Sequence, residues 1–267
     1  MPTEDDKLGR PEYDLPEILK KVRAQTPARL LAGRSGAAYR TNTQLELREA
    51  HAAARDAVQA ELNLSTDLGD DFVRKWNLFE VCSQAANKEE YLLRPDLGRH
   101  LNEASRAEIS TRCTTGNDLQ VVIGDGLSVT AVTRQVPKLL PLLSEGAKKR
   151  GWSVGQMFVI RHCRVGIVNE IGELLTPKVA ILLIGERPGL ATAESLSAYM
   201  AHQPKASDTD ADRNLISNIH SRGVSLKQAG ERILNLAAAM MKTKKSGCEL
   251  REELPVETGL APSEDHL

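Results

Sequence analysis

The sequence predicts an α/β protein with a helical N-terminal region. Two observations support this fold class. Residues 43–113 repeat apolar side chains at three- to four-residue spacing, which is typical of amphipathic helices. From residue 118 onward, short apolar runs alternate with helical segments, which is typical of a small, mainly parallel, Rossmann-like sheet. We expect three regions: a mobile arm at 1–27, a helical domain at 28–115 and an α/β domain at 116–267.

Composition excludes several classes of function. The 267 residues include 41% hydrophobic and 27% charged side chains, with a formal net charge of −1. Neither nucleic acid nor an anionic membrane is therefore expected as the main partner. The longest uncharged apolar run, residues 179–185, is far shorter than a membrane span. Four scattered cysteines without a CxxC pair, and a polar N-terminus, favour a soluble cytoplasmic protein with reduced thiols.

The first half of the chain predicts helices. Thr43 is a suitable N-cap for a long Ala-rich helix, which we expect to face the core or another subunit. Pro95 suits the first turn of a later helix. Before the Ala-rich helix, the glycines at 33 and 36 predict a loop at 30–40. The helices predicted here are 43–64, 70–87 and 95–113.

The second half of the chain predicts strands that alternate with helices. β-Branched runs predict strands at 119–123, 157–162 and 179–185. Pro137 suits a helix start and Gly151 a helix end, while Ser225 is a suitable N-cap. The helices predicted here are 137–150, 165–175 and 225–241.

Three loops follow the three predicted strands. Because parallel strands place their carboxyl ends at one edge of a sheet, these loops should lie together and form a ligand site. Each combines a glycine or a helix start with polar groups that could meet phosphate or amide oxygens. The loops are 124–128, 161–165 and 185–189.

Common catalytic motifs are incomplete in these loops. Val129 stands where a dinucleotide fingerprint needs its third glycine, and the chain has no P-loop. The segment 126–130 lacks the closing glycine of a nucleophile elbow, so we favour a turn in which Asp125 bonds its own backbone. Glu186 either pairs with Arg187 at the surface or accepts hydrogen bonds at a pocket mouth. We assign no catalytic residue.

A histidine motif near the C-terminus invites a cobalt-ligand interpretation. Residues 218–223 differ by one residue from D-x-H-x-x-G, the signature of cobalamin proteins whose histidine binds cobalt. Asn218 replaces the aspartate that would orient the imidazole, so we favour a structural role for His220. His162 and Cys163 lack further ligands at suitable spacing, and we assign no metal site.

Five segments, in order, closely resemble the small (light) subunit of ethanolamine ammonia-lyase. The resemblance covers residues 28–247 and is most specific in the Gly-Glu-Arg-Pro-Gly-Leu stretch. The segments are Arg94–Arg99, Asp118–Ser128, Ile181–Leu190, Glu194–Ser197 and Ala211–His220.

The resemblance implies an adenosylcobalamin-dependent lyase that converts ethanolamine to acetaldehyde and ammonia by a radical mechanism. It implies a hetero-oligomer in which a TIM-barrel large subunit holds the substrate. The α/β domain of the small subunit covers the cobalamin, which is bound base-on. The matching cofactor contacts are Val165, Glu186 and Leu215, the last being cysteine in some relatives. Packaging in a bacterial microcompartment is implied for some organisms.

A second interpretation uses the same loops differently. The chain could be a free-standing α/β enzyme that binds a nucleotide or another small ligand. The missing third glycine and the lack of a spaced nucleophile and base count against it.

Overall fold

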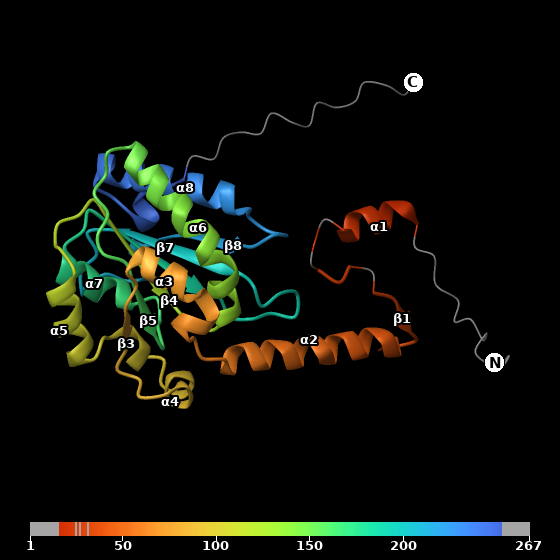
Figure 1. Cartoon of the computed structure of the whole chain (residues 1–267). Coiled ribbons are helices and arrows are strands. Elements are labelled where there is room, and N and C mark those ends of the chain that lie inside the picture. The colour runs from red at the N-terminus through yellow and green to blue at the C-terminus, as the bar shows by residue number, and fades with distance from the viewer. Residues whose placement is uncertain (1–15, 25, 27, 31, 253–267) are drawn as a thin grey trace, which may run out of the picture.

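A six-stranded sheet forms the centre of the protein, as the computed structural model shows for residues 16–24, 26, 28–30 and 32–252 (Figure 1). Its strand order is β3-β5-β4-β6-β7-β8. The strands are β3 (Glu80–Cys82), β4 (Leu119–Gly124), β5 (Phe158–Arg161), β6 (Val179–Gly185), β7 (Leu196–His202) and β8 (Asn214–Ile219).

The sheet is mainly parallel, as predicted. β3, β5, β4 and β6 run in the same direction, whereas β7 is antiparallel to both of its neighbours, β6 and β8. The carboxyl ends of the four parallel strands therefore lie at one edge, together with the amino end of β7 and the carboxyl end of β8.

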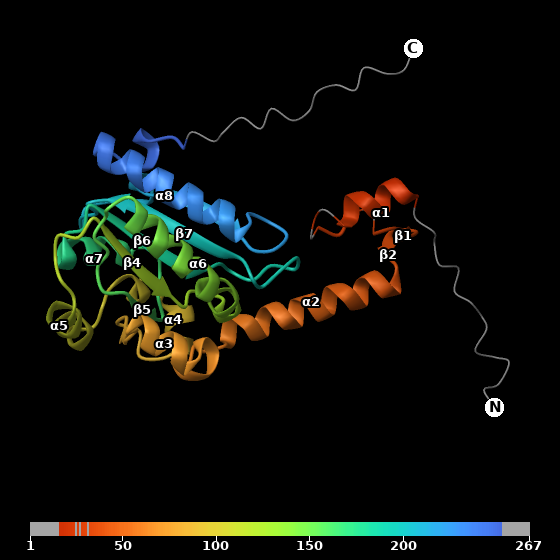
Figure 2. The ribbon, with the colours of Figure 1, turned by 45° about the horizontal axis from the view of Figure 1, so that its top comes forward.

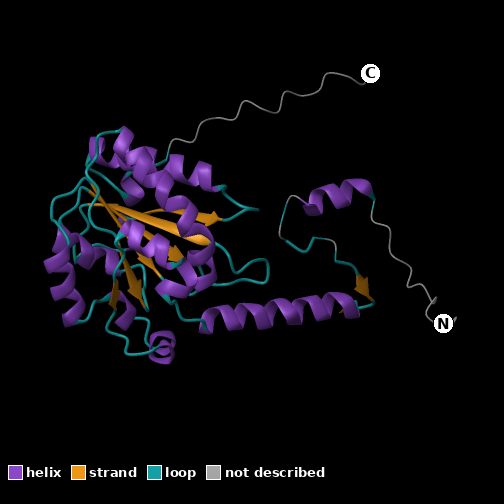
Figure 3. Ribbon diagram, viewed as in Figure 1, coloured by secondary structure: helices purple, strands orange, loops and turns teal. Residues whose placement is uncertain are grey.

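Helices pack on both faces of the sheet (Figures 2 and 3). α6 (Val129–Lys149) and α8 (Leu226–Thr243) cover one face, where their apolar side chains join one core cluster. α5 (Glu103–Arg112) and α7 (Ile167–Leu175) pack on the other face and join a second cluster. The side chains of β4, β5 and β6 alternate between the two clusters, as pleated strands require.

The N-terminal region is helical apart from a two-stranded hairpin and the edge strand β3. α2 leaves the body of the protein and extends away from it, with α1 near its far end (Figure 1). The elements are α1 (Glu17–Ala24), β1 (Arg34–Ser35), β2 (Ala38–Tyr39), α2 (Thr41–Gln59), α3 (Asp70–Trp76) and α4 (Lys88–Leu93). One-turn helices occur at Leu64–Leu68, Leu97–Arg99, Asp210–Asp212 and Gly247–Glu249.

Most elements predicted from strong apolar patterns are confirmed. The three predicted strands correspond to β4, β5 and β6, and every residue of β4 and β6 is buried. Ser225 caps α8, since its hydroxyl accepts a hydrogen bond from the Gln228 amide, 3.3 Å away. Gly151, with φ of +70°, follows the end of α6.

The prediction of one helix over 70–87 is wrong. Asn77 adopts a left-handed conformation, with φ of +47°, and ends α3 after two turns. The chain then enters β3, where Glu80 pairs with Val159 of β5. Sheet pairing outweighs the helix-like spacing of the apolar residues here. The region before residue 115 is therefore not wholly helical, although its division into domains stays a prediction.

The helix predicted over 95–113 is also wrong at its start. α4 ends at Leu93, before Pro95, and α5 begins only at Glu103. Asn102 provides the cap, because its side-chain oxygen accepts a hydrogen bond from the Ser105 amide at 2.8 Å.

The predicted start of α6 at Pro137 is wrong by two turns. The helix begins at Val129, and both Pro137 and Pro141 lie inside it. An interior proline costs a helix about 3 kcal/mol because it removes a hydrogen bond. Ten residues of α6 are buried, so packing against the sheet and α8 outweighs this cost.

Much of the predicted N-terminal arm lies outside the described residues. Its described part contains α1, whose side chains are not buried. Among the residues that the structure describes, no helix has both the length and the apolar character needed to cross a bilayer.

Candidate functional site

The three loops predicted to form a site come together at the carboxyl edge of the sheet. They surround a hollow of about 180 Å³, to which Gly126, Val165 and Glu186 each contribute from a different loop. Tyr91 from α4 and Tyr199 from β7 complete its walls. The loop assembly predicted from parallel strand direction is therefore present.

Two of the three predicted contact residues line this hollow, and the third lies on a nearby strand. Val165 and Glu186 line the hollow, whereas Leu215 lies on β8. Leu215 pairs with Tyr199 across the β7–β8 ladder, so these two side chains share one face of the sheet. Tyr199 lines the hollow and thereby links Leu215 to it.

Leu215 lies on a part of its sheet face that is exposed to solvent, which we call the uncovered face. Its exposed fraction is 44%, whereas that of the adjacent Ile216, on the opposite face, is 0%. α8 contacts β7 and β8 on the Ile216 side, while α7 packs against β6 on the other side.

Glu186 connects three strands. Its Oε1 atom accepts hydrogen bonds from the Ser197 hydroxyl at 2.7 Å and from the Asn218 amide at 2.8 Å. Within the described residues, Oε2 accepts none, and Glu186 makes no ion pair with Arg187. The structure therefore favours a Glu186 carboxylate that accepts hydrogen bonds at a pocket mouth over a surface ion pair with Arg187.

A buried carboxylate supports the loop that carries Val165. Asp125 accepts hydrogen bonds from the amides of His162 and Cys163, both at 2.9 Å, and not from its own loop as predicted. Burial raises the pKa of Asp125, whereas the nearby ammonium of Lys88 lowers it. Burial also lowers the pKa of Lys88, which lies 3.5 Å from the Gly126 carbonyl oxygen. This group of charges joins the first two loops to α4.

Sequence reasoning missed Tyr91, which stacks against Arg164 of the predicted loop 161–165 in the hollow. The Tyr91 hydroxyl donates to the Cys163 carbonyl at 2.8 Å, and the Arg164 guanidinium carbon lies 4.4 Å from the centre of the Tyr91 ring. The Arg164 Nε atom is buried without a hydrogen-bond partner among the described residues. No local pattern could identify this stacked pair, because its members are 73 positions apart in the chain.

The glycine loop and Ser128 have structural roles. A Cβ atom on Gly126 would lie 2.3 Å from the Gly185 carbonyl oxygen, so the glycine permits close packing of two loops. Ser128 is fully buried and caps α6 by accepting a hydrogen bond from the Ala131 amide at 3.2 Å. Neither arrangement resembles a phosphate cradle or an activated nucleophile.

His220 is buried in the turn between β8 and α8. Its Nε2 atom lies 2.7 Å from the Asn218 Oδ1 atom, and its Nδ1 atom accepts a hydrogen bond from the Arg222 amide at 3.2 Å. Because both ring nitrogens are engaged within this turn, the structure favours the structural role predicted for His220.

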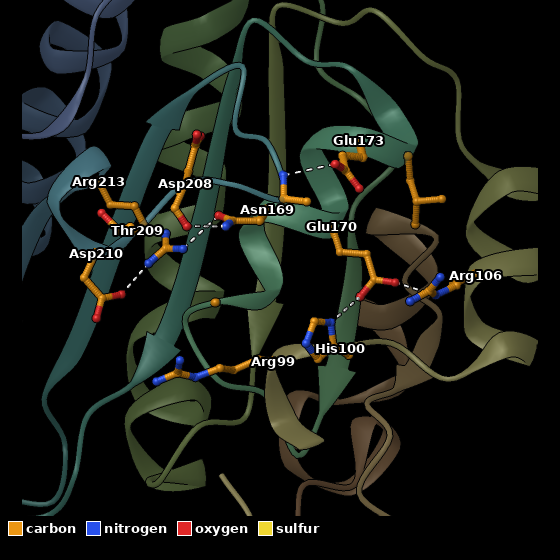
Figure 4. Close-up of a pocket in the computed structure, with 13 residues that line it drawn as sticks. Arg99, His100, Arg106, Asn169, Glu170, Glu173, Asp208, Thr209, Asp210 and Arg213 are labelled. Carbon is orange, nitrogen blue, oxygen red and sulfur yellow. Dashed lines mark hydrogen bonds and ion pairs between the residues drawn. The ribbon is translucent and has the colours of Figure 1, made fainter. Parts of the chain in front are cut away.

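A larger hollow of about 640 Å³ lies between α7 and the segment joining β7 to β8 (Figure 4). Its charged groups are mostly paired with one another. Arg213 bonds to Asn169 at 2.8 Å and also pairs with Asp210, while Glu170 pairs with Arg106. These contacts tie the β7–β8 segment and α5 to α7, so we assign them a structural role.

The fold and site define a mixed-sheet α/β protein with a hollow at the carboxyl ends of its parallel strands. Its sequence matches the family model described as ethanolamine ammonia-lyase light chain over residues 16–251. The chain therefore belongs to the ethanolamine ammonia-lyase light chain family, whose members are subunits of a lyase.

Relatives named as ethanolamine ammonia-lyase small subunit cover most of the chain. One from Clostridium acetobutylicum is 41% identical over 240 residues, which are 90% of this chain and 97% of the relative. One from Clostridium perfringens is 40% identical over 88% of this chain and 78% of the relative. One from Listeria monocytogenes is 39% identical over 86% and 77%.

Proposed function

We propose that this chain forms one wall of the adenosylcobalamin site of ethanolamine ammonia-lyase, and that the large subunit forms the other. The observation that carries this proposal is the position of Val165 and Glu186 in one hollow, next to the uncovered sheet face that bears Leu215.

The chemistry of these residues fits a corrin. A corrin has apolar faces and a rim of amide groups, which need both donors and acceptors. Val165, Tyr199 and Leu215 offer apolar contacts along one surface. Glu186 has an oxygen available for an amide N–H, and the exposed Arg187, which also lines the hollow, could donate to an amide oxygen.

The size of the hollow supports a shared site. Pockets that bury a whole small molecule measure about 300–1,000 Å³. The hollow around Val165 measures about 180 Å³, which is too small to enclose a corrin. The names of the relatives, which are small subunits, imply a larger partner subunit to complete the site. We propose a TIM barrel for this partner, on the resemblance alone.

The bound coenzyme supplies radical chemistry through homolysis of its cobalt–carbon bond. This chain binds and orients the coenzyme and shields it. Its described residues near the hollow include no nucleophile with an adjacent base, so we propose that it supplies no acid, base or nucleophile to the reaction. We also propose base-on binding, since His220 already uses both ring nitrogens within its own turn.

A free-standing nucleotide-binding enzyme is the alternative. Its phosphate loop would be the segment 124–128, in which Gly126 packs against Gly185. Gly126 is therefore needed for the contact between two loops. Its presence does not support a phosphate-binding role.

Retention of corrin tests the proposal. The chain would be purified with its large subunit, mixed with hydroxocobalamin, separated from free corrin by gel filtration and examined by visible spectroscopy. We expect corrin absorbance to elute with the complex and to be weaker for either subunit alone. Equal retention by the large subunit alone would contradict a wall formed by this chain, and turnover by the lone chain would favour the alternative.

A further inference from the structure

The turn between β8 and α8 is built around Asn218. This residue has a left-handed backbone, with φ of +61°, and its carbonyl accepts a hydrogen bond from the Val224 amide at 2.8 Å. A Cβ atom on Gly223 would lie 2.2 Å from the same carbonyl oxygen, so only glycine permits this close packing. In this conformation the Asn218 amide donates to Glu186.

The hydrogen bonds of His220 fix its tautomer. Nδ1 accepts from the Arg222 amide and therefore carries no proton. The proton of the neutral ring lies on Nε2, from which it is donated to the Asn218 side-chain oxygen at 2.7 Å. A buried imidazole thus holds the Asn218 side chain, and the Asn218 backbone holds Glu186.

We infer that His220 is a positioning residue, which orients the Glu186 carboxylate through Asn218 for the proposed contact with the corrin. This role rests on the proposed function of Glu186. It does not involve cobalt, and it explains a histidine motif without cobalt ligation. The Ser197 hydroxyl fixes the same Glu186 oxygen from β7, so removal of the His220 contact should loosen the carboxylate without freeing it.

Acid should weaken this positioning. A second proton on Nδ1 would face the Arg222 N–H group and remove its acceptor. The charged groups that act on His220 are Arg222 from its own turn, Glu186 from the end of β6 and Glu194 from the β6–β7 segment. Burial and Arg222 lower the pKa of His220, while the two carboxylates raise it. The ring is therefore neutral at pH 7.

Two substitutions remove the link in different ways. His220→Leu keeps an apolar side chain in place of the buried ring but removes both of its hydrogen bonds. Asn218→Gly keeps the left-handed backbone and the amide that donates to Glu186, but removes the side chain that His220 holds. The second variant also keeps the imidazole, so it tests the link even where His220→Leu fails to assemble with the large subunit.

Spectral titration of the two-subunit complex with cyanocobalamin measures the effect. We expect each variant to bind cyanocobalamin roughly fivefold more weakly, as the loss of one hydrogen bond implies. The double variant should be no weaker than either single one, because both changes break the same link. His220→Gln, which retains a donor toward Asn218, should restore most of the affinity and should lose the weakening below pH 6.5.

His202→Gln is the matched control. His202 is a partly buried histidine at the opposite end of β7, and it makes no contact with the site. Its replacement should leave the affinity within twofold of wild type. Unchanged affinity in His220→Leu and Asn218→Gly, or a roughly 25-fold loss in the double variant, would overturn the positioning role. A wild-type complex that retains no cyanocobalamin would instead overturn the proposed function.

Discussion

The two faces of β8 differ in what covers them. Ile216 points to the side of α6 and α8 and is fully buried, whereas the adjacent Leu215 points to the opposite side and is 44% exposed. Both residues belong to the same strand, so the contrast does not come from the strand itself. The difference arises because α8 packs over Ile216, whereas α7 packs against β6 on the opposite side and leaves Leu215 exposed.

This comparison separates residues that hold the fold from residues that we propose contact a ligand. On the covered face, apolar side chains interlock with two helices and contribute directly to stability. On the uncovered face, apolar and polar side chains stand beside the hollow at the strand ends. Substitutions on the two faces should therefore affect different measurements.

The largest expected effect is on stability, at the covered face. Ile216→Ala should lower the free energy of unfolding by about 2–4 kcal/mol, because it leaves a cavity in the core. Leu215→Ala should change it by less than about 1 kcal/mol. Denaturant unfolding of the two variants measures the contrast, and equal losses would show that the two faces are equally packed.

The next effect is on coenzyme affinity, at the uncovered face. Glu186→Gln preserves an acceptor for Ser197 and Asn218 but removes the charge. Because a hydrogen bond to a charged group contributes about 1.5–3 kcal/mol, we expect at least tenfold weaker binding. Coenzyme titration of the complex measures this.

Glu145→Gln is the control for that variant, since Glu145 lies exposed on α6 over the covered face. It should bind the coenzyme as wild type does. Unchanged affinity in Glu186→Gln would remove Glu186 from the site.

A smaller effect should show how Leu215 contributes. Leu215→Asp places a charge on the apolar wall and should weaken coenzyme binding about tenfold, since an unpaired charge is costly to bury. Leu215→Cys should stay within about threefold of wild type if the backbone makes the contact. A large loss in the cysteine variant would instead assign the contact to the leucine side chain.

The smallest effect is on the pH dependence of stability. The pKa values of His220 and His202 are lowered by burial in the folded chain. Below pH 6.5 the unfolded chain therefore takes up protons that the folded chain does not, and stability falls as the pH falls. Above pH 6.5 neither histidine contributes.

His220→Gln should remove part of this slope, and His202→Gln another part. Unfolding free energies at pH 7.5 and 5.5 measure the change in each variant. A slope identical to that of wild type in both variants would contradict burial of the neutral rings.

The sequence predicted the elements whose patterns are strong and local. The β-branched runs of β4 and β6, each bounded by a glycine, favour buried strands. β3 has three residues, and its flanking apolar residues follow a helical spacing, so only pairing with β5 identifies it. The strands β7 and β8 also depend on pairing and were not predicted.

The site was predictable only in part. The expected parallel direction of the strands predicted which loops meet, and the family resemblance implied Val165, Glu186 and Leu215 as contacts. The contacts that position them join distant segments, as when Asp125 binds the amide of Cys163 or Tyr91 bonds to its carbonyl. Such contacts leave no periodic signal, because they depend on the tertiary arrangement of the strand ends.

The accessibility of position 215 most directly tests whether the uncovered face meets the coenzyme. A Leu215→Cys chain, with the solvent-accessible Cys82 and Cys248 changed to serine, would be assembled with the large subunit and treated with a thiol reagent. We predict that cyanocobalamin slows modification at position 215. Modification at the same rate with and without bound cyanocobalamin would contradict a corrin wall on this face.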